Sequence, residues 1–214
     1  MKYIDIETAP LPEETLRQTM PKFAAPANWK DAEKIQAKIK EQEAAYIEKA
    51  ALSPMTGRVQ AIGIYCDEED AYTALDEWVC SESELCDQFW KHVAPSGAIT
   101  APVYGWNHRG FDIPFMVKRS WRNGVKVPST VFDTYKGRTY LNPKFLDLMR
   151  VWTLGTDERF AKLDSALEFL TQTRKIDLGD KLPYEVFRED NELFHEYLRH
   201  DVEGLDLIAT AMHV

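Results

Sequence analysis

The chain has 214 residues, of which 44% are hydrophobic and 12% aromatic, which is enough to fill a sizeable core and excludes a largely disordered protein. Its formal net charge of −9 is the opposite of what most nucleic-acid-binding proteins carry. Three cysteines without C-x-x-C spacing exclude a disulfide framework and a zinc knuckle. No apolar run has the length of a signal peptide or a membrane span, so we expect a cytoplasmic protein without membrane contacts.

The first eight residues, MKYIDIET, have the composition of a β-strand but contain two acids. Residues two apart on a strand share a face, so Asp5 and Glu7 point the same way. Two neighbouring carboxylates in a partly dry place repel each other unless a cation lies between them. The segment therefore indicates a metal site. A frayed strand with a solvated acidic edge is the alternative, and this segment alone does not exclude it.

Residues 9 to 57 differ from the rest of the chain in their prolines and dense mixed charges. We interpret them as an insertion within a single domain that spans residues 1 to 214. Residues 30 to 51 lack Pro and Gly and carry apolar residues at near-helical spacing, which predicts a long, thinly amphipathic helix.

The remaining sequence alternates strand and helix patterns, which indicates an α/β fold. The predicted elements are strands at 58–66 and 71–75 joined by the acidic turn DEED, a helix at 81–93, a strand at 98–107, a helix at 111–124, a strand at 145–152 and a helix at 190–214.

Two of these elements carry further acids. Asp112, in GWNHRGFDIPF, lies at a strand-to-helix junction, where N-capping of the helix is a sufficient alternative explanation. Tyr197 and Asp201, in YLRHD, are four residues apart on a helix and lie on one face of it. Taken alone, such a pair is more often a core edge and a surface acid.

In their order and setting, the three segments resemble the exonuclease motifs of the DEDD superfamily, within the ribonuclease H-like fold. The motifs are D-I-E-T, N-x-x-x-F-D-x-P-F and Y-x-x-x-D. The resemblance is closest to the tyrosine subtype, as in the proofreading domain of family B DNA polymerases and stand-alone predicted exonucleases related to it. The histidine subtype has His five residues before the last Asp, where this chain has Glu196. The resemblance implies a mixed five-stranded sheet flanked by helices, with a helical insertion between the first two strands.

The resemblance also implies the chemistry. The protein is expected to be a 3′-5′ exonuclease that releases nucleoside monophosphates from single-stranded ends, with DNA ahead of RNA, using two divalent ions, Mg²⁺ or Mn²⁺. A replication or repair protein is a further expected partner. The expected catalytic residues are Asp5, Glu7, Asp112, Tyr197 and Asp201, of which the four acids bind the metal ions and the tyrosine orients the attacking water.

A basic stretch suggests where the substrate binds. Residues 113 to 150 contain eight basic residues against two acids, a local charge of +6. The basic residues are Lys118, Arg119, Arg122, Lys126, Lys136, Arg138, Lys144 and Arg150, with Tyr135, Tyr140 and Phe145 among them. Interleaved basic and aromatic side chains suit a single-stranded end, and a solvated basic surface with core aromatics is the alternative.

Six residues in or next to the first two motifs are expected to line the pocket for the terminal nucleotide, with plain packing as the alternative. They are Thr8, Trp106, Asn107, His108, Arg109 and Phe111. Two other functions fit the same fold. A non-catalytic nucleic-acid or partner-binding module would not need complete motifs, and a ribonuclease H-like endonuclease would not need the tyrosine.

Overall fold

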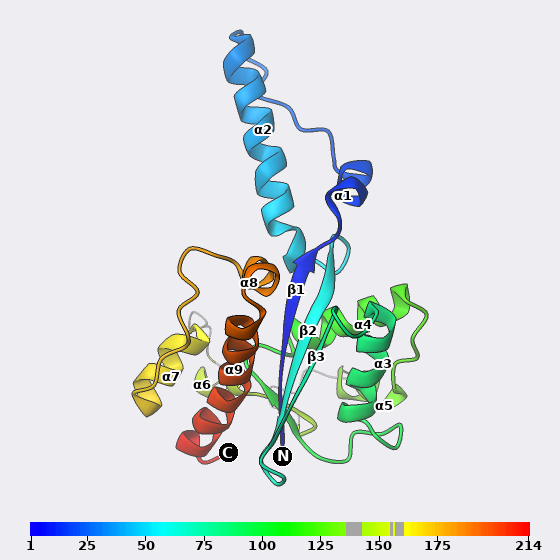
Figure 1. The fold of residues 1–214 in the computed structure, drawn as a ribbon, viewed down its shortest axis with the longest axis vertical. Helices are drawn as coiled ribbons and strands as arrows, with labels where there is room; N and C mark the ends of the chain where they lie inside the picture. Colours follow the sequence, from blue (N-terminus) through cyan, green and yellow to red (C-terminus); the bar gives the residue numbers. More distant parts are fainter. Residues whose placement is uncertain (136–142, 155, 157–160) are drawn as a thin grey trace. The chain divides into compact units, whose positions relative to one another are not determined.

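The computed structural model describes residues 1–135, 143–154, 156 and 161–214, and its centre is a mixed five-stranded sheet (Figure 1). The strand order is β3-β2-β1-β4-β5. The strands are β1 (Lys2–Pro10), β2 (Gly57–Cys66), β3 (Ala71–Asp76), β4 (Val103–Gly105) and β5 (Phe145–Asp147). β2 and β3 form the predicted antiparallel hairpin, whereas β4 runs parallel to both β1 and β5. The predicted α/β architecture is confirmed.

Helices connect and flank these strands. They are α1 (Glu13–Thr19), α2 (Ala32–Glu48) and the 3₁₀ helix η1 (Lys49–Leu52) between β1 and β2, followed by α3 (Glu82–Val93), α4 (Asp112–Arg122), α5 (Ser129–Tyr135), α6 (Leu148–Trp152), α7 (Leu163–Thr171), α8 (Pro183–Glu189) and α9 (Asn191–Met212). The sequence patterns miss α1, α5, α7 and α8, because seven to nine residues are too few to establish a helical period.

Two predicted strands are too long. The strand predicted at 98–107 is reduced to β4, because Pro102 has no N–H for a ladder and the chain turns after Gly105. The strand predicted at 145–152 ends at Asp147. The carboxylate of Asp147 accepts a hydrogen bond from the backbone N–H of Met149 at 3.2 Å and thereby caps α6.

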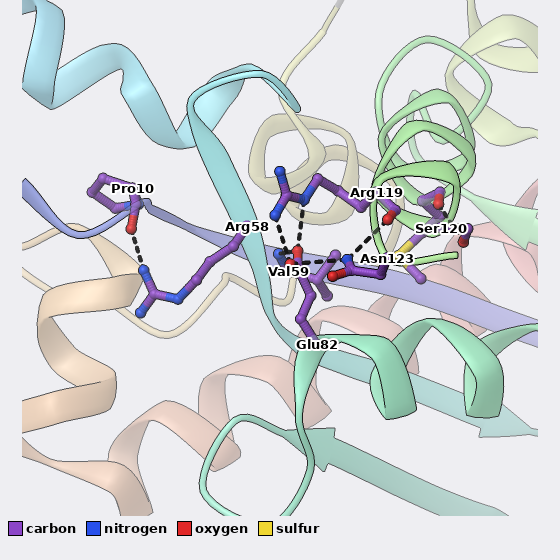
Figure 2. A network of polar contacts seen from close by, with 8 residues as sticks. Pro10, Arg58, Val59, Glu82, Arg119, Ser120 and Asn123 are labelled. Atoms are coloured by element: carbon purple, nitrogen blue, oxygen red, sulfur yellow. Dashed lines mark hydrogen bonds and ion pairs between the residues drawn. The ribbon is translucent and has the colours of Figure 1, made fainter. Parts of the chain in front are cut away.

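The chain forms two compact units, one of Met1–Glu7 with Val59–Val214 and one of Thr8–Arg58. In the second unit the carboxylate of Asp31 caps α2, and no residue of α2, all of which is described, is buried. The two ends of this unit are joined to each other, since the guanidinium of Arg58 donates to the carbonyl of Pro10 (Figure 2). The interpretation as one domain with an insertion at 9–57 stays a prediction.

In the larger unit, helices cover both faces of the sheet, with α3 and α4 on one side and α7, α8 and α9 on the other (Figure 1). Strand alternation sends Ile4 and Ile6 into the core beneath α3 and α4 and sends Tyr3 toward α9. The side chains of Asp5 and Glu7 point to the same face of the sheet as that of Tyr3. Gly63 lets α9 approach β2, because a Cβ there would lie 3.0 Å from the side chain of Leu198.

A buried ion pair joins α3 to α4 (Figure 2). The guanidinium of Arg119, 5% exposed, donates to both carboxylate oxygens of Glu82 at 2.7 and 2.6 Å. Glu82 also accepts from the backbone N–H of Val59 at 2.9 Å and from the side-chain amide of Asn123 at 3.1 Å. The prediction that Arg119 contributes to a phosphate-binding stretch is therefore wrong, because its charge is paired with Glu82 in the interior.

Among the described residues, no helix is long and apolar enough to cross a bilayer.

Candidate active site

Three carboxylates from opposite ends of the chain meet at one point. Asp5 and Glu7 come from β1 and Asp201 from α9, and one oxygen of each lies within 4.8 Å of the others. Asp201 is 1% exposed, whereas Asp5 and Glu7 are partly exposed. The spacing of two along a strand and the packing of α9 against β2 and β3 produce this cluster.

Asp112 joins the site from a third element. It is the first residue of α4 and is 3% exposed. Its Oδ1 accepts a hydrogen bond from the backbone N–H of Ile6 at 3.1 Å, between the two acids of β1. The carboxylate thus contacts β1 and does not cap α4, so capping is not the explanation for an acid at this position.

Crowding and burial make the ionised forms of these acids unfavourable. Burial, and then the charge of Asp201, raise the pKa of Asp5 to about 7, although Lys175 opposes the shift. Burial and the charge of Asp5 likewise raise the pKa of Glu7 and that of Asp112 well above their usual range. Without a cation, this site favours protonated carboxyl groups.

Lys175 supplies a cation that the sequence analysis missed. Its Nζ lies 2.5 Å from Oδ2 of Asp201, donates to the hydroxyl of Tyr197 at 3.0 Å and stands 4.7 Å from the centre of that ring. Burial lowers the pKa of Lys175, but the charges of Asp201 and Asp5 outweigh it, so the pKa is raised. Lys175 lies in the irregular segment between α7 and α8, where no periodic pattern marks it out.

Tyr197 is one helical turn before Asp201 and is 9% exposed. Burial, and then the charges of Glu7 and Asp201, raise the pKa of its phenol. The hydroxyl therefore stays protonated at neutral pH. Its oxygen accepts from Lys175, and its O–H is hydrogen-bonded to the carboxylate of Asp201.

Asp147 fixes the loop that leads into Asp112, which is a second role that the sequence analysis missed. Its two carboxylate oxygens accept from the backbone N–H groups of Asn107 at 3.0 Å and Arg109 at 3.2 Å. The loop also needs Gly105, since a Cβ there would lie 2.7 Å from that of His108. Asp147 is directly opposite Gly105 in the β4–β5 register, which explains why it reaches this loop.

The residues expected to contact the terminal nucleotide differ in their exposure to solvent. His108 is fully buried and packs against Phe145, and burial lowers its pKa to about 3, so the prediction that it contacts the nucleotide is wrong. Trp106 is partly exposed and its Nε1 donates to the carbonyl of Ala161 at 3.0 Å. Phe111 is partly exposed beside Phe115, and Thr8 is buried in the second unit. For these two residues and for Trp106, Asn107 and Arg109, the expectation stays a prediction.

The basic stretch is divided by the fold. Lys118, Arg122 and Lys126 are exposed. Phe145 is fully buried, which makes it a core aromatic and no platform for a base. Lys136, Arg138, Tyr140 and the side chain of Tyr135 lie outside the described residues.

The donor set fits a hard divalent cation. The oxygens of Asp5, Glu7 and Asp201 are the ligand type that Mg²⁺ and Mn²⁺ prefer. Among the described residues, Oδ1 of Asp201 is buried without a hydrogen-bond partner, which is costly unless a cation takes that place.

The sequence model of a family described as "Predicted 3'-5' exonuclease related to the exonuclease domain of PolB" matches residues 54–205. The chain belongs to this family. The matched residues include Asp112, Lys175, Tyr197 and Asp201, and the fold adds Asp5 and Glu7 from the strand that precedes the match. No curated protein matches the chain.

A solved structure shares the fold of this predicted exonuclease. It is the family B DNA polymerase from the hyperthermophilic archaeon Pyrobaculum calidifontis, with a TM-score of 0.58 and 15% sequence identity over 99% of this chain. The match covers 24% of the polymerase, so the chain spans about a quarter of that protein's length. The likeness establishes the mixed sheet and flanking helices of this protein as an exonuclease-like fold of the polymerase B type.

Proposed function

We propose that this member of the family is a metal-dependent 3′-5′ exonuclease that removes nucleoside monophosphates from single-stranded nucleic acid, with DNA preferred over RNA. The observation that supports it best is the meeting of Asp5, Glu7 and Asp201 within 4.8 Å, with Tyr197 one helical turn from Asp201. Three carboxylates crowded together in this way destabilise the metal-free protein and are hard to explain as a structural feature.

The reaction is hydrolysis of the terminal phosphodiester. Water attacks the phosphorus atom, the bond from phosphorus to the 3′ oxygen breaks, and the shortened strand leaves with a 3′ hydroxyl. Asp5, Glu7, Asp112 and Asp201 would hold two divalent ions. When bound, such ions supply a more acidic water and neutralise charge on the leaving oxygen.

The chain's own residues orient the reactants. The hydroxyl of Tyr197, held between Lys175 and Asp201, positions the attacking water. Its raised pKa keeps the phenol protonated at neutral pH, so it does not act as the base. Lys175 holds that hydroxyl and places a positive charge next to Asp201. Asp147 keeps the loop before Asp112 in place through backbone N–H groups.

Digestion of labelled strands tests the proposal. Single-stranded DNA, duplex DNA and RNA, each labelled at the 5′ end, and a circular single strand labelled internally are compared with Mg²⁺ present. We expect stepwise shortening of the linear single strands, fastest for DNA, and no cleavage of the circle. Cleavage of the circle would favour an endonuclease, and binding of the linear strands without any cleavage would favour a non-catalytic module.

Tyr197→Phe is expected to lower kcat about ten- to a hundredfold while KM changes less than about threefold. The ring stays packed and Lys175 keeps its contact with Asp201, so only the hydroxyl that positions the water is lost. Steady-state kinetics on labelled single strands measure both constants. A raised KM with unchanged kcat would instead assign Tyr197 to substrate stacking.

A further inference from the structure

Two exposed aromatic side chains stack on each other away from the carboxylates. Trp121, at the C-terminal end of α4, is 60% exposed, and Phe132, in α5, is 38% exposed. Their ring centroids are 6.1 Å apart and their planes differ by 14°. Large aromatic side chains exposed together offer a flat apolar surface to a binding partner.

Positive charge lies beside this pair, on α4 and in the loop after it, and one exposed acid, Asp133, follows Phe132. Lys118 and Arg122 lie on the exposed side of α4, and Lys126 follows in the next loop. None of the three forms an ion pair with any residue in the described part of the chain. In a protein whose formal net charge is −9, three exposed cations next to exposed aromatics are a local reversal of sign.

A cleft of about 530 Å³ adjoins the stacked pair. Phe132 forms part of its lining, together with Trp90 and Val127. Lys126 contributes a charge, and Asp87 and Lys91, which also line the cleft, pair with each other at 2.6 Å. Phe132 therefore connects the aromatic pair to a recess of mixed apolar and charged lining, in which Lys126 is the cation outside the Asp87–Lys91 pair.

We infer that the surface formed by Trp121, Phe132, Lys118, Arg122 and Lys126, the α4–α5 surface, binds single-stranded nucleic acid at a second place outside the active site. Bases stack on the aromatic rings without regard to sequence, and the three cations contact phosphates. Charge complementarity selects this polyanion. The inference rests on the proposed function in one respect, namely that the strand bound here is the same strand whose 3′ end is cut in the active site.

The position of the α4–α5 surface determines which substrates reach it. Trp121 is nine residues after Asp112 on α4, about 14 Å along the helix axis and on its opposite side. To reach it from the active site, a strand must pass around α4 as well as along it, and a strand of two or three nucleotides is too short to do both. A longer, flexible strand does both, so the surface strengthens binding of long strands only.

Binding is tested without cleavage, on the full chain with a chelator present, using a single-stranded DNA of about 15 nucleotides. We expect Trp121→Ala and Phe132→Ala each to weaken binding about tenfold or more. Arg122→Ala is expected to reduce the slope of log affinity against log salt by about one. Trp78→Phe is the matched control, because Trp78 is 65% exposed and lies next to Asp76 and Glu77, and it should bind like the parent.

A kinetic comparison completes the test with Mg²⁺ present. Trp121→Ala should raise KM about tenfold for the strand of about 15 nucleotides and leave it unchanged for one of about three. If the parent cuts both strands and Trp121→Ala matches it on both, the inference is wrong and the proposed function stands. If the parent binds through Trp121 but cuts nothing, the proposed function is wrong and the α4–α5 surface stands. An acidic peptide that binds in place of DNA would also overturn the inference.

Discussion

Replacing either Asp5 or Asp201 with Ala is expected to lower the cleavage rate at least about a thousandfold, because each removes a ligand from the three-carboxylate cluster. The rate is measured on 5′-labelled single-stranded DNA with saturating Mg²⁺. Activity of either variant within about tenfold of the parent would contradict the assignment. Phe169→Ala is a suitable control, since Phe169 is 77% exposed and does not contact the cluster.

The two variants should differ in stability, and this difference tests the geometry independently of activity. Asp5→Ala relieves repulsion in the metal-free protein, because burial and Asp201 raise the pKa of Asp5 to about 7. Asp201→Ala leaves Lys175, whose side chain is 21% exposed, without its carboxylate partner. We expect the melting temperature to rise for Asp5→Ala and to fall for Asp201→Ala. Equal shifts in the same direction would mean that Lys175 does not pair with Asp201 in solution.

Removal of divalent ions is expected to abolish cleavage and to make stability depend strongly on pH. The pKa of Asp5 is 3.8 in the unfolded chain and about 7 in the fold, so the folded protein binds more protons between those values. Stability of the metal-free protein therefore falls as pH rises through this range. The raised pKa values of Glu7 and Asp112 act in the same direction and extend the effect upward.

Added Mg²⁺ or Mn²⁺ should reverse this loss, since cations bind the deprotonated carboxylates. At a concentration a hundred times the dissociation constant, binding stabilises a protein by about 2.7 kcal/mol, which raises the melting temperature of a chain of this size by about 5–10 °C. We expect the larger shift at pH 8 and a smaller one at pH 5, where protons compete. The measurement is thermal unfolding with chelator and with metal, and Asp5→Ala should show a flatter pH profile. A metal shift of equal size at both pH values would contradict a carboxylate site.

Local geometry explains what the sequence predicted correctly at the site. Asp5 and Glu7 share a face because alternate residues of any strand do, and Tyr197 and Asp201 share one because a helix turns in 3.6 residues. These relations depend only on the backbone of one element. The motif order then predicted the mixed sheet and the helices that bring the elements together, and the family match and the shared fold confirm that part.

By itself, then, the sequence determined the fold class and which acids face one another within each element. Only the tertiary structure decided which charges are paired and which rings are exposed. Lys175, in an irregular segment, pairs with Asp201, and Arg119 pairs with Glu82 in the interior. His108 is fully buried. Trp121 of α4 stacks on Phe132 of α5. The physical reason is that burial and ion pairing depend on what packs against a side chain. Asp201 is 26 residues from Lys175 along the chain, and Glu82 is 37 residues from Arg119. A helical or strand pattern relates only residues within one element, so it does not predict these pairs.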